Sequence, residues 1–145
     1  KVVIPTQKTG QKRVMKDVRI SYAENWQREH WKSLEAAYRN SPFFEHYESE
    51  IHDFYTQKTE HLLEFNLEFF EVINKLIKIN FNYSLTEDYE SLCSVDYRDS
   101  AFDLMEPISY MQVFVDRFDF IPNLSILDAL FCLGPDTKTL IENSR

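Results

Sequence analysis

Glycine is almost absent from this chain of 145 residues, which contains only Gly10 and Gly134. A loop that wraps a phosphate group with backbone N–H groups needs glycine, because such loops use positive φ angles. Neither glycine lies in a GxGxxG or GxxxxGK pattern. The sequence therefore argues against the common nucleotide-binding loops, and we expect no cofactor.

Cysteine is equally scarce, and its two copies, Cys93 and Cys132, are far apart and lack metal-ligand spacing. We expect two unpaired thiols, as is usual in a reducing cytoplasm, in preference to a disulfide. His46 and His52 are six residues apart, which places them on opposite faces of a helix, so they cannot share one ion. The sequence predicts no metal site, and it predicts His46, His52 and His61 at the surface.

Long hydrophobic runs are also missing. No stretch approaches the roughly 18 apolar residues of a transmembrane helix, and no signal peptide is visible. The net charge of −8 argues against binding nucleic acid or an anionic membrane, because either requires many Lys and Arg residues. Basic residues between Lys8 and Arg19 leave local anion binding open, although a solvated hairpin is the simpler explanation. We expect a cytoplasmic protein without membrane insertion and without a nucleic-acid partner.

Aromatic residues, by contrast, are abundant: twelve Phe, eight Tyr and two Trp. Each buried aromatic side chain removes about 150–250 Å² from water, so the composition predicts an aromatic-rich core. The length fits a single domain over residues 1–145. Because the chain begins at Lys1 with a strand-like run, we interpret it as a fragment of a longer protein.

Four segments show the pattern of β-strands. Residues 2–5 and 14–20 are predicted to pair as a hairpin around the polar loop 6–13. Residues 82–85 and 110–115 are predicted to be two further short strands. The segment 86–107 is polar, acidic and without periodicity, so we expect a long, mobile surface loop there.

Amphipathic patterns predict helices over most of the remaining chain. The first covers residues 24–39, the second begins at Pro42 with Ser41 as its N-cap, and the third covers 59–79. Asn123 is predicted to cap a short helix over 124–133, after which Gly134 and Pro135 lead into a last helix. We expect the first three helices to form an antiparallel layer. The predicted class is α+β, mostly helical, with at least three packed amphipathic helices and a small antiparallel sheet.

The candidate functional residues gather around Trp26 and Trp31. Trp26 and His30 are four residues apart, so they share one helical face. His30 is either a core-edge imidazole bonded to a backbone carbonyl, or a general base or donor that works near neutral pH. In the second case, His30 should be partly accessible and should contact a polar side chain, either Asp17 or one within 123–128.

Several short motifs also occur in a fixed order along the chain. They are KDVRI at 16–20, NW at 25–26, HWK at 30–32, Tyr38, SPFF at 41–44, FIPNLSILD at 120–128 and GP at 134–135. Together, from about Val3 to Gly134, they resemble the WbqC-like family of bacterial proteins, which is associated with surface-polysaccharide and O-antigen gene clusters. Family members usually open with a further segment carrying a Tyr-Leu-Pro or Tyr-Phe-Pro motif, which is not found here.

The resemblance implies a role in bacterial surface-polysaccharide biosynthesis, with a sugar or sugar-nucleotide intermediate as partner. It suggests a transferase that moves an acyl or aminoacyl group to an amino sugar; the alternative is a non-enzymatic binding or scaffold protein. By position, it implies His30 and Asp17 as catalytic residues. It implies a larger set for substrate binding: Lys16, Arg19, Asn25, Trp26, Trp31, Asn123 and Asp128.

A missing N-terminal segment would have a further consequence. The first strand and the first helix would expose an apolar patch that the segment normally covers. A second copy of the chain is the simplest replacement cover, so we expect a homodimer.

Overall fold

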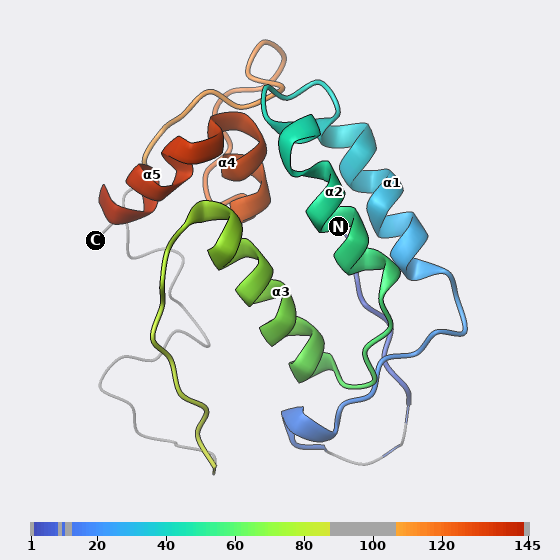
Figure 1. The fold of residues 1–145 in the computed structure, drawn as a ribbon. Helices are drawn as coiled ribbons and strands as arrows, with labels where there is room; N and C mark the ends of the chain where they lie inside the picture. The colour runs from blue at the N-terminus through green and yellow to red at the C-terminus, as the bar shows by residue number, and fades with distance from the viewer. Residues whose placement is uncertain (1, 9, 11–12, 88–106, 144–145) are drawn as a thin grey trace.

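The computed structural model describes residues 2–8, 10, 13–87 and 107–143, and these are largely helical (Figure 1). The α-helices are α1 (Trp26–Tyr38), α2 (Phe44–Thr56), α3 (Leu62–Ile77), α4 (Ile126–Leu133) and α5 (Thr137–Asn143). Two 3-10 turns accompany them, η1 (Met15–Asp17) and η3 (Gly134–Asp136). Helices α1, α2 and α3 run in alternating directions, α4 packs on α2, and α5 packs on α4. The predicted antiparallel order of the first three helices is therefore confirmed.

The predicted α+β class is wrong, because the described residues contain no β-strand and no sheet. Within the predicted strand 14–20 the chain turns instead, and the Asp17 amide donates to the Val14 carbonyl at 3.0 Å to close η1. Of the alternating apolar residues, only Ile20 is buried, while Val14 is 57% exposed. The alternating residues therefore do not form a buried face. A strand is fixed in register only where one of its faces is buried.

What remains of the predicted hairpin is a pair of isolated antiparallel bridges, Thr6 with Ile20 and Arg19 with His61. The Ile20 amide also donates to the Glu60 carbonyl at 2.9 Å. The segment after η1 is therefore held between the start of the chain and the start of α3. Each pairing is too short to continue as a ladder.

The predicted strand at 110–115 is also absent, since the Val115 amide donates to the Gln112 carbonyl within a turn. Gln112 is buried, and its side-chain amide bonds both backbone groups of Ile121, at 2.8 and 3.0 Å. This side chain satisfies the groups that a partner strand would otherwise satisfy. Residues 82–85 contain no strand either. The loop predicted at 86–107 lies almost entirely outside the described residues.

Three helices begin two residues later than predicted, at 26 instead of 24, at 44 instead of 42 and at 126 instead of 124, and α3 begins three residues later, at 62 instead of 59. Ser41 does not cap α2; its hydroxyl donates to the Tyr38 carbonyl at 2.6 Å, at the end of α1. Ser125, not Asn123, caps α4 by accepting the Leu127 amide at 3.3 Å. Asn123 instead adopts a left-handed backbone with φ of 57°, which asparagine tolerates better than most residues.

Two buried clusters fill the helical layer, and the aromatic-rich core expected from composition is confirmed. Helix α2 contributes to both, so it joins them. The N-terminal core consists of Ile20, Trp26, Phe54 and Phe65. The α4 core consists of Phe44, Tyr47, Ile51, Ile73, Ile77, Leu127, Leu130 and Phe131.

The surface near the start of the chain carries exposed apolar side chains. Val2, Val3, Val14 and Met15 are each at least half exposed. The homodimer that would cover them stays a prediction. Among the helices of the described residues, none is long and apolar enough to cross a membrane.

Candidate functional site

His30, the leading candidate, is a buried residue of the N-terminal core region. Only 5% of its surface is exposed. Its Nε2 lies 3.1 Å from the Val3 carbonyl, and because a carbonyl can only accept, Nε2 carries the proton. The rings of Trp26 and Tyr55 lie against it, with centroids 5.0 and 6.0 Å away. Burial lowers the pKa of His30, and the bond to Val3 only partly opposes this shift.

The expectation that His30 is partly accessible and bonded to a polar side chain is therefore wrong. In the described part of the chain its hydrogen bond goes to backbone, and Asp17 lies exposed in η1. Lys16, Arg19 and Asn25 are exposed as well, and Arg19 pairs with Glu60 at 2.5 Å. The catalytic assignment of His30 and Asp17 stays a prediction, but the structure does not bring the two side chains together.

The two tryptophans also separate, although both lie on α1. Trp26 belongs to the N-terminal core, and its buried indole N–H has no hydrogen-bond partner among the described residues. Trp31 packs on the α4 core, where it stacks on Phe44 with centroids 6.0 Å apart. Five residues correspond to about 140° around a helix, so the two indoles face different neighbours. They do not form one wall of a single site.

The other end of the molecule holds a buried carboxylate. Asp128 lies in α4 and is 3% exposed. It accepts a hydrogen bond from the Tyr110 hydroxyl at 2.7 Å. Tyr38 of α1 lies close enough to feel its charge, and Cys132 lies one turn further along α4. A buried carboxylate needs such donors, because leaving it unpaired costs several kcal/mol.

These neighbours respond electrostatically to Asp128. Burial raises the pKa of Tyr38 and of Tyr110 above the usual 10.0; the charge of Asp128 raises that of Tyr38 further, and the hydrogen bond to Asp128 raises that of Tyr110 further. Burial, with the Asp128 charge second, raises the pKa of the Cys132 thiol to about 11. Cys132 is a free, buried thiol, as predicted. Both hydroxyls and the thiol thus stay protonated at neutral pH.

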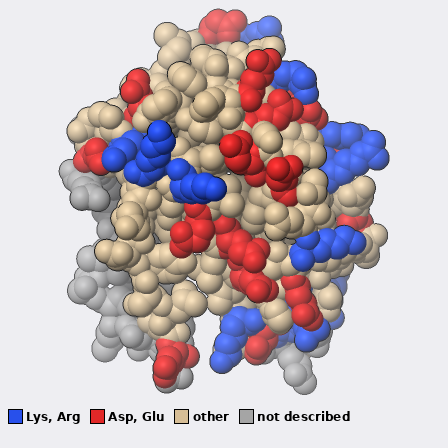
Figure 2. All heavy atoms as spheres, viewed as in Figure 1, with Lys and Arg blue, Asp and Glu red and all other residues tan. Residues whose placement is uncertain are grey.

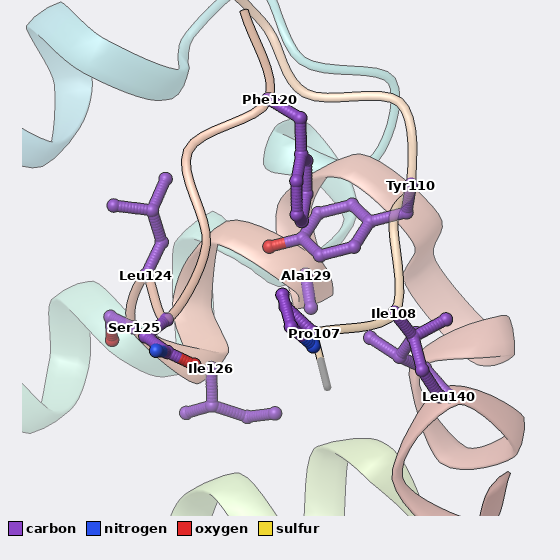
Figure 3. Close-up of a pocket in the computed structure, with 10 residues that line it drawn as sticks. Pro107, Ile108, Tyr110, Phe120, Leu124, Ser125, Ile126, Ala129 and Leu140 are labelled. Carbon is purple, nitrogen blue, oxygen red and sulfur yellow. The ribbon is translucent and has the colours of Figure 1, made fainter. Parts of the chain in front are cut away.

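A pocket of about 310 Å³ lies beside this cluster, and we call it the α4 pocket. Figure 3 shows Tyr110 and Phe120 reaching into it from the chain that precedes α4. Their rings contact edge to face at 5.6 Å. The remaining lining is mixed apolar and polar: Pro107, Ile108, Asn123, Leu124, Ser125, Ile126, Ala129 and Leu140.

The chain matches the sequence model of the WbqC-like protein family over residues 1–103. It belongs to the WbqC-like family. For this WbqC-like chain, comparison with curated proteins and with solved structures gave no match. The family match includes α1, α2 and α3, while the α4 pocket lies beyond its end.

Two of the residues predicted to bind substrate lie at or beside the α4 pocket, and two of its aromatic residues were not predicted. Sequence reasoning named Asn123 and Asp128. Asn123 lines the α4 pocket, and Asp128 accepts a hydrogen bond from Tyr110, which also lines it. It did not name Tyr110, which was assigned to the predicted strand 110–115, or Phe120, which was noted only as the first residue of the motif at 120–128. One signal was available: Asp128 is the single charged residue of the helix ILDALFCL, so burial with a hydroxyl partner could have been inferred.

The structure offers no obvious place for a metal ion. Within the residues that it describes, no group of three or more His, Cys, Asp or Glu side chains has a suitable arrangement. The α4 pocket presents neutral donors and acceptors together with aromatic rings. Such a surface is suited to recognise a neutral, hydroxyl-bearing molecule.

Proposed function

We propose that the chain binds a sugar intermediate of bacterial surface-polysaccharide (O-antigen) biosynthesis in the α4 pocket. The pathway in this proposal is supported by family membership together with the association of that family with polysaccharide gene clusters. The location is supported by the pocket chemistry. Its volume of about 310 Å³ is of the size that holds a small molecule.

The observation that carries the proposal is the Tyr110 hydroxyl, which is fixed by the Asp128 carboxylate at 2.7 Å. This hydroxyl donates its proton to Asp128, so its oxygen can only accept a hydrogen bond from a ligand, and it shares that acceptor role with the nearby Gln112 side-chain amide. A sugar hydroxyl can donate that bond. The apolar face of the sugar ring can then pack on Phe120 and Leu124.

The test is an NMR titration of the isotopically labelled protein with N-acetylglucosamine, glucosamine and UDP-N-acetylglucosamine. We expect saturable shifts in the backbone amides of residues 108–110, 120, 121 and 123–129. Tyr110→Phe should weaken binding about 5- to 30-fold, because one hydrogen bond is lost. Tyr83→Phe is the matched control, since Tyr83 is exposed and bonds Glu71 on α3. Saturable shifts elsewhere, or equal effects of both variants, would refute the location.

The resemblance also suggests a reaction in which an amino sugar receives an acyl or aminoacyl group. The alternative is binding without chemistry, and the burial of His30 against Val3 favours it. Incubation with glucosamine and acetyl-coenzyme A, followed by mass spectrometry of the sugar, separates the two. Acetylated glucosamine that disappears with Tyr110→Phe supports a transferase. A sugar that binds and is recovered unchanged supports the binding function.

A further inference from the structure

A second pocket, of about 320 Å³, lies where α2, the end of α3 and the start of α5 meet. Three lysines line it: Lys75 and Lys78 from the end of α3, and Lys138 from α5. His46 and Glu50 of α2 complete its polar lining. Figure 2 shows basic side chains gathered on this face amid acidic surroundings. We call this site the lysine pocket.

The positive charge of the lysine pocket is unusual for this chain. The protein carries a net charge of −8, yet this pocket is lined by three lysines and one carboxylate residue, Glu50, while Lys75 and Glu50 also line a neighbouring pocket with Asp53 and Glu68. Among the described residues, no carboxylate forms an ion pair with Lys75 or Lys78, and Lys138 meets Glu142 only at 4.0 Å. An anion that enters a pocket lined by several lysines is attracted by all of them, and its charge offsets their mutual repulsion.

Lys78 adds a second, independent observation. It is the C-cap of α3 and has a left-handed backbone, with φ of 56° and ψ of 41°. Glycine is the usual residue at this position, because a side chain there introduces strain. Strain of this kind is concentrated at functional sites. The chain thus places an ammonium group at a strained position that lines the pocket.

A simpler explanation accounts for only part of the cluster. Lysines in the last turn of a helix stabilise its dipole, which is sufficient for Lys75. It extends to the charge of Lys78, the C-cap of the same helix, but it does not explain Lys138, which lies on another helix. A ligand between the helices explains all three lysines together.

We propose that the lysine pocket binds a phosphate-bearing small molecule, with Lys75, Lys78 and Lys138 as donors to the phosphate oxygens. Ammonium groups bind phosphate as point charges, and no glycine-rich loop is needed for this. The site is distinct from the α4 pocket, because Lys138 and Leu140 are two residues apart on α5 and lie on opposite sides of it. The proposal therefore stands or fails independently of sugar binding.

The experiment is a calorimetric and NMR titration with sodium phosphate, sodium pyrophosphate and UDP, at low salt and again at physiological salt. We expect saturable binding and shifts at residues 75–79 and 135–138. Tighter binding of pyrophosphate or UDP than of phosphate would identify a diphosphate ligand, and the reverse order a phosphate monoester. Binding that is not saturable, or that disappears completely at physiological salt, would overturn the proposal.

Two variants separate the site from general charge effects. Lys78→Gly removes an ammonium group at a position where glycine relieves strain, so the protein should remain folded. It should weaken anion binding about tenfold, as should Lys75→Gln. The matched control is Lys32→Gln on the exposed face of α1, which changes net charge equally and should weaken binding less than about twofold. Equal weakening by Lys32→Gln would show diffuse attraction and overturn the proposal.

Discussion

His30 and Asp128 are both buried ionisable residues on helices, with 5% and 3% of their surfaces exposed, yet their surroundings differ. His30 bonds to a backbone carbonyl and lies against aromatic rings, so its imidazole is buried beside the N-terminal core. Asp128 bonds to Tyr110, whose ring lines an open pocket. Burial by itself therefore does not mark a functional group. What matters is whether its hydrogen-bond partner reaches a surface where a ligand can bind.

The largest effect should come from the aromatic packing around the His30 region. Phe65 is 4% exposed and packs against Trp26 and Phe54, so Phe65→Ala should lower the free energy of unfolding by about 3–5 kcal/mol. Two other apolar residues of α3 are less buried, since Phe70 is 39% exposed and Leu67 is half-buried. Phe70→Ala should cost about 1 kcal/mol. Urea denaturation measures both, and equal losses would contradict this packing.

The region of Asp128 depends on a close backbone contact at the end of α4. A Cβ on Gly134 would lie 2.5 Å from the Phe43 ring, and its φ of 58° already disfavours a side chain. Gly134→Ala should therefore cost about 2–5 kcal/mol. Gly10→Ala is the matched control: its φ is 65°, but nothing lies within 4 Å. Thermal unfolding should show a clearly smaller loss for that control, of about 1–2 kcal/mol.

Removing the Tyr110 hydroxyl tests how much the hydrogen bond to Asp128 contributes to stability. Tyr110→Phe deletes a hydrogen bond to a buried carboxylate and should cost about 1.5–3 kcal/mol. Tyr83→Phe should change stability little, because Tyr83 is exposed. Chemical denaturation at neutral pH provides the measurement. An unchanged stability in Tyr110→Phe would mean that water or another donor replaces the hydroxyl.

The two tyrosines near Asp128, Tyr38 and Tyr110, predict how stability responds to alkaline pH. The folded-state pKa values of Tyr38 and Tyr110 are raised above 10.0, so the folded protein retains protons that the unfolded chain releases. The free energy of unfolding should be unaffected by these groups below about pH 10 and should decrease as the pH rises further. In Tyr110→Phe the decrease should be shallower. A slope equal to that of the unaltered chain would contradict the assignment.

The smallest effect should appear on the acid side and concerns His30. Burial lowers its pKa below 6.5, so on acidification the unfolded state binds a proton before the folded state does. Its contribution to stability is present above about pH 6.5 and is lost as the pH falls toward the lowered pKa. His30→Gln should remove this dependence. Denaturation at pH 7 and pH 5.5, compared between the two proteins, measures it.

The sequence determined the helices and their order because each bears a long, regular apolar stripe. The spacing of Tyr47, Ile51 and Phe54 in α2 is sufficient to define a buried face without knowledge of the partner. The family was also recognisable, because its motifs are local and occur in order. Asp128 could be singled out for the same reason, as one charge inside an apolar helix.

Tertiary structure alone decided the outcome wherever the partner was remote in sequence. The alternating residues 14–20 lack a long partner strand, so backbone hydrogen bonding closed a 3-10 turn there. Tyr110 and Asp128 are 18 residues apart and meet only because Gln112 closes the intervening turn on Ile121. Local periodicity specifies which face of an element is apolar. It does not specify which distant group will satisfy a buried charge, and that pairing formed the candidate site.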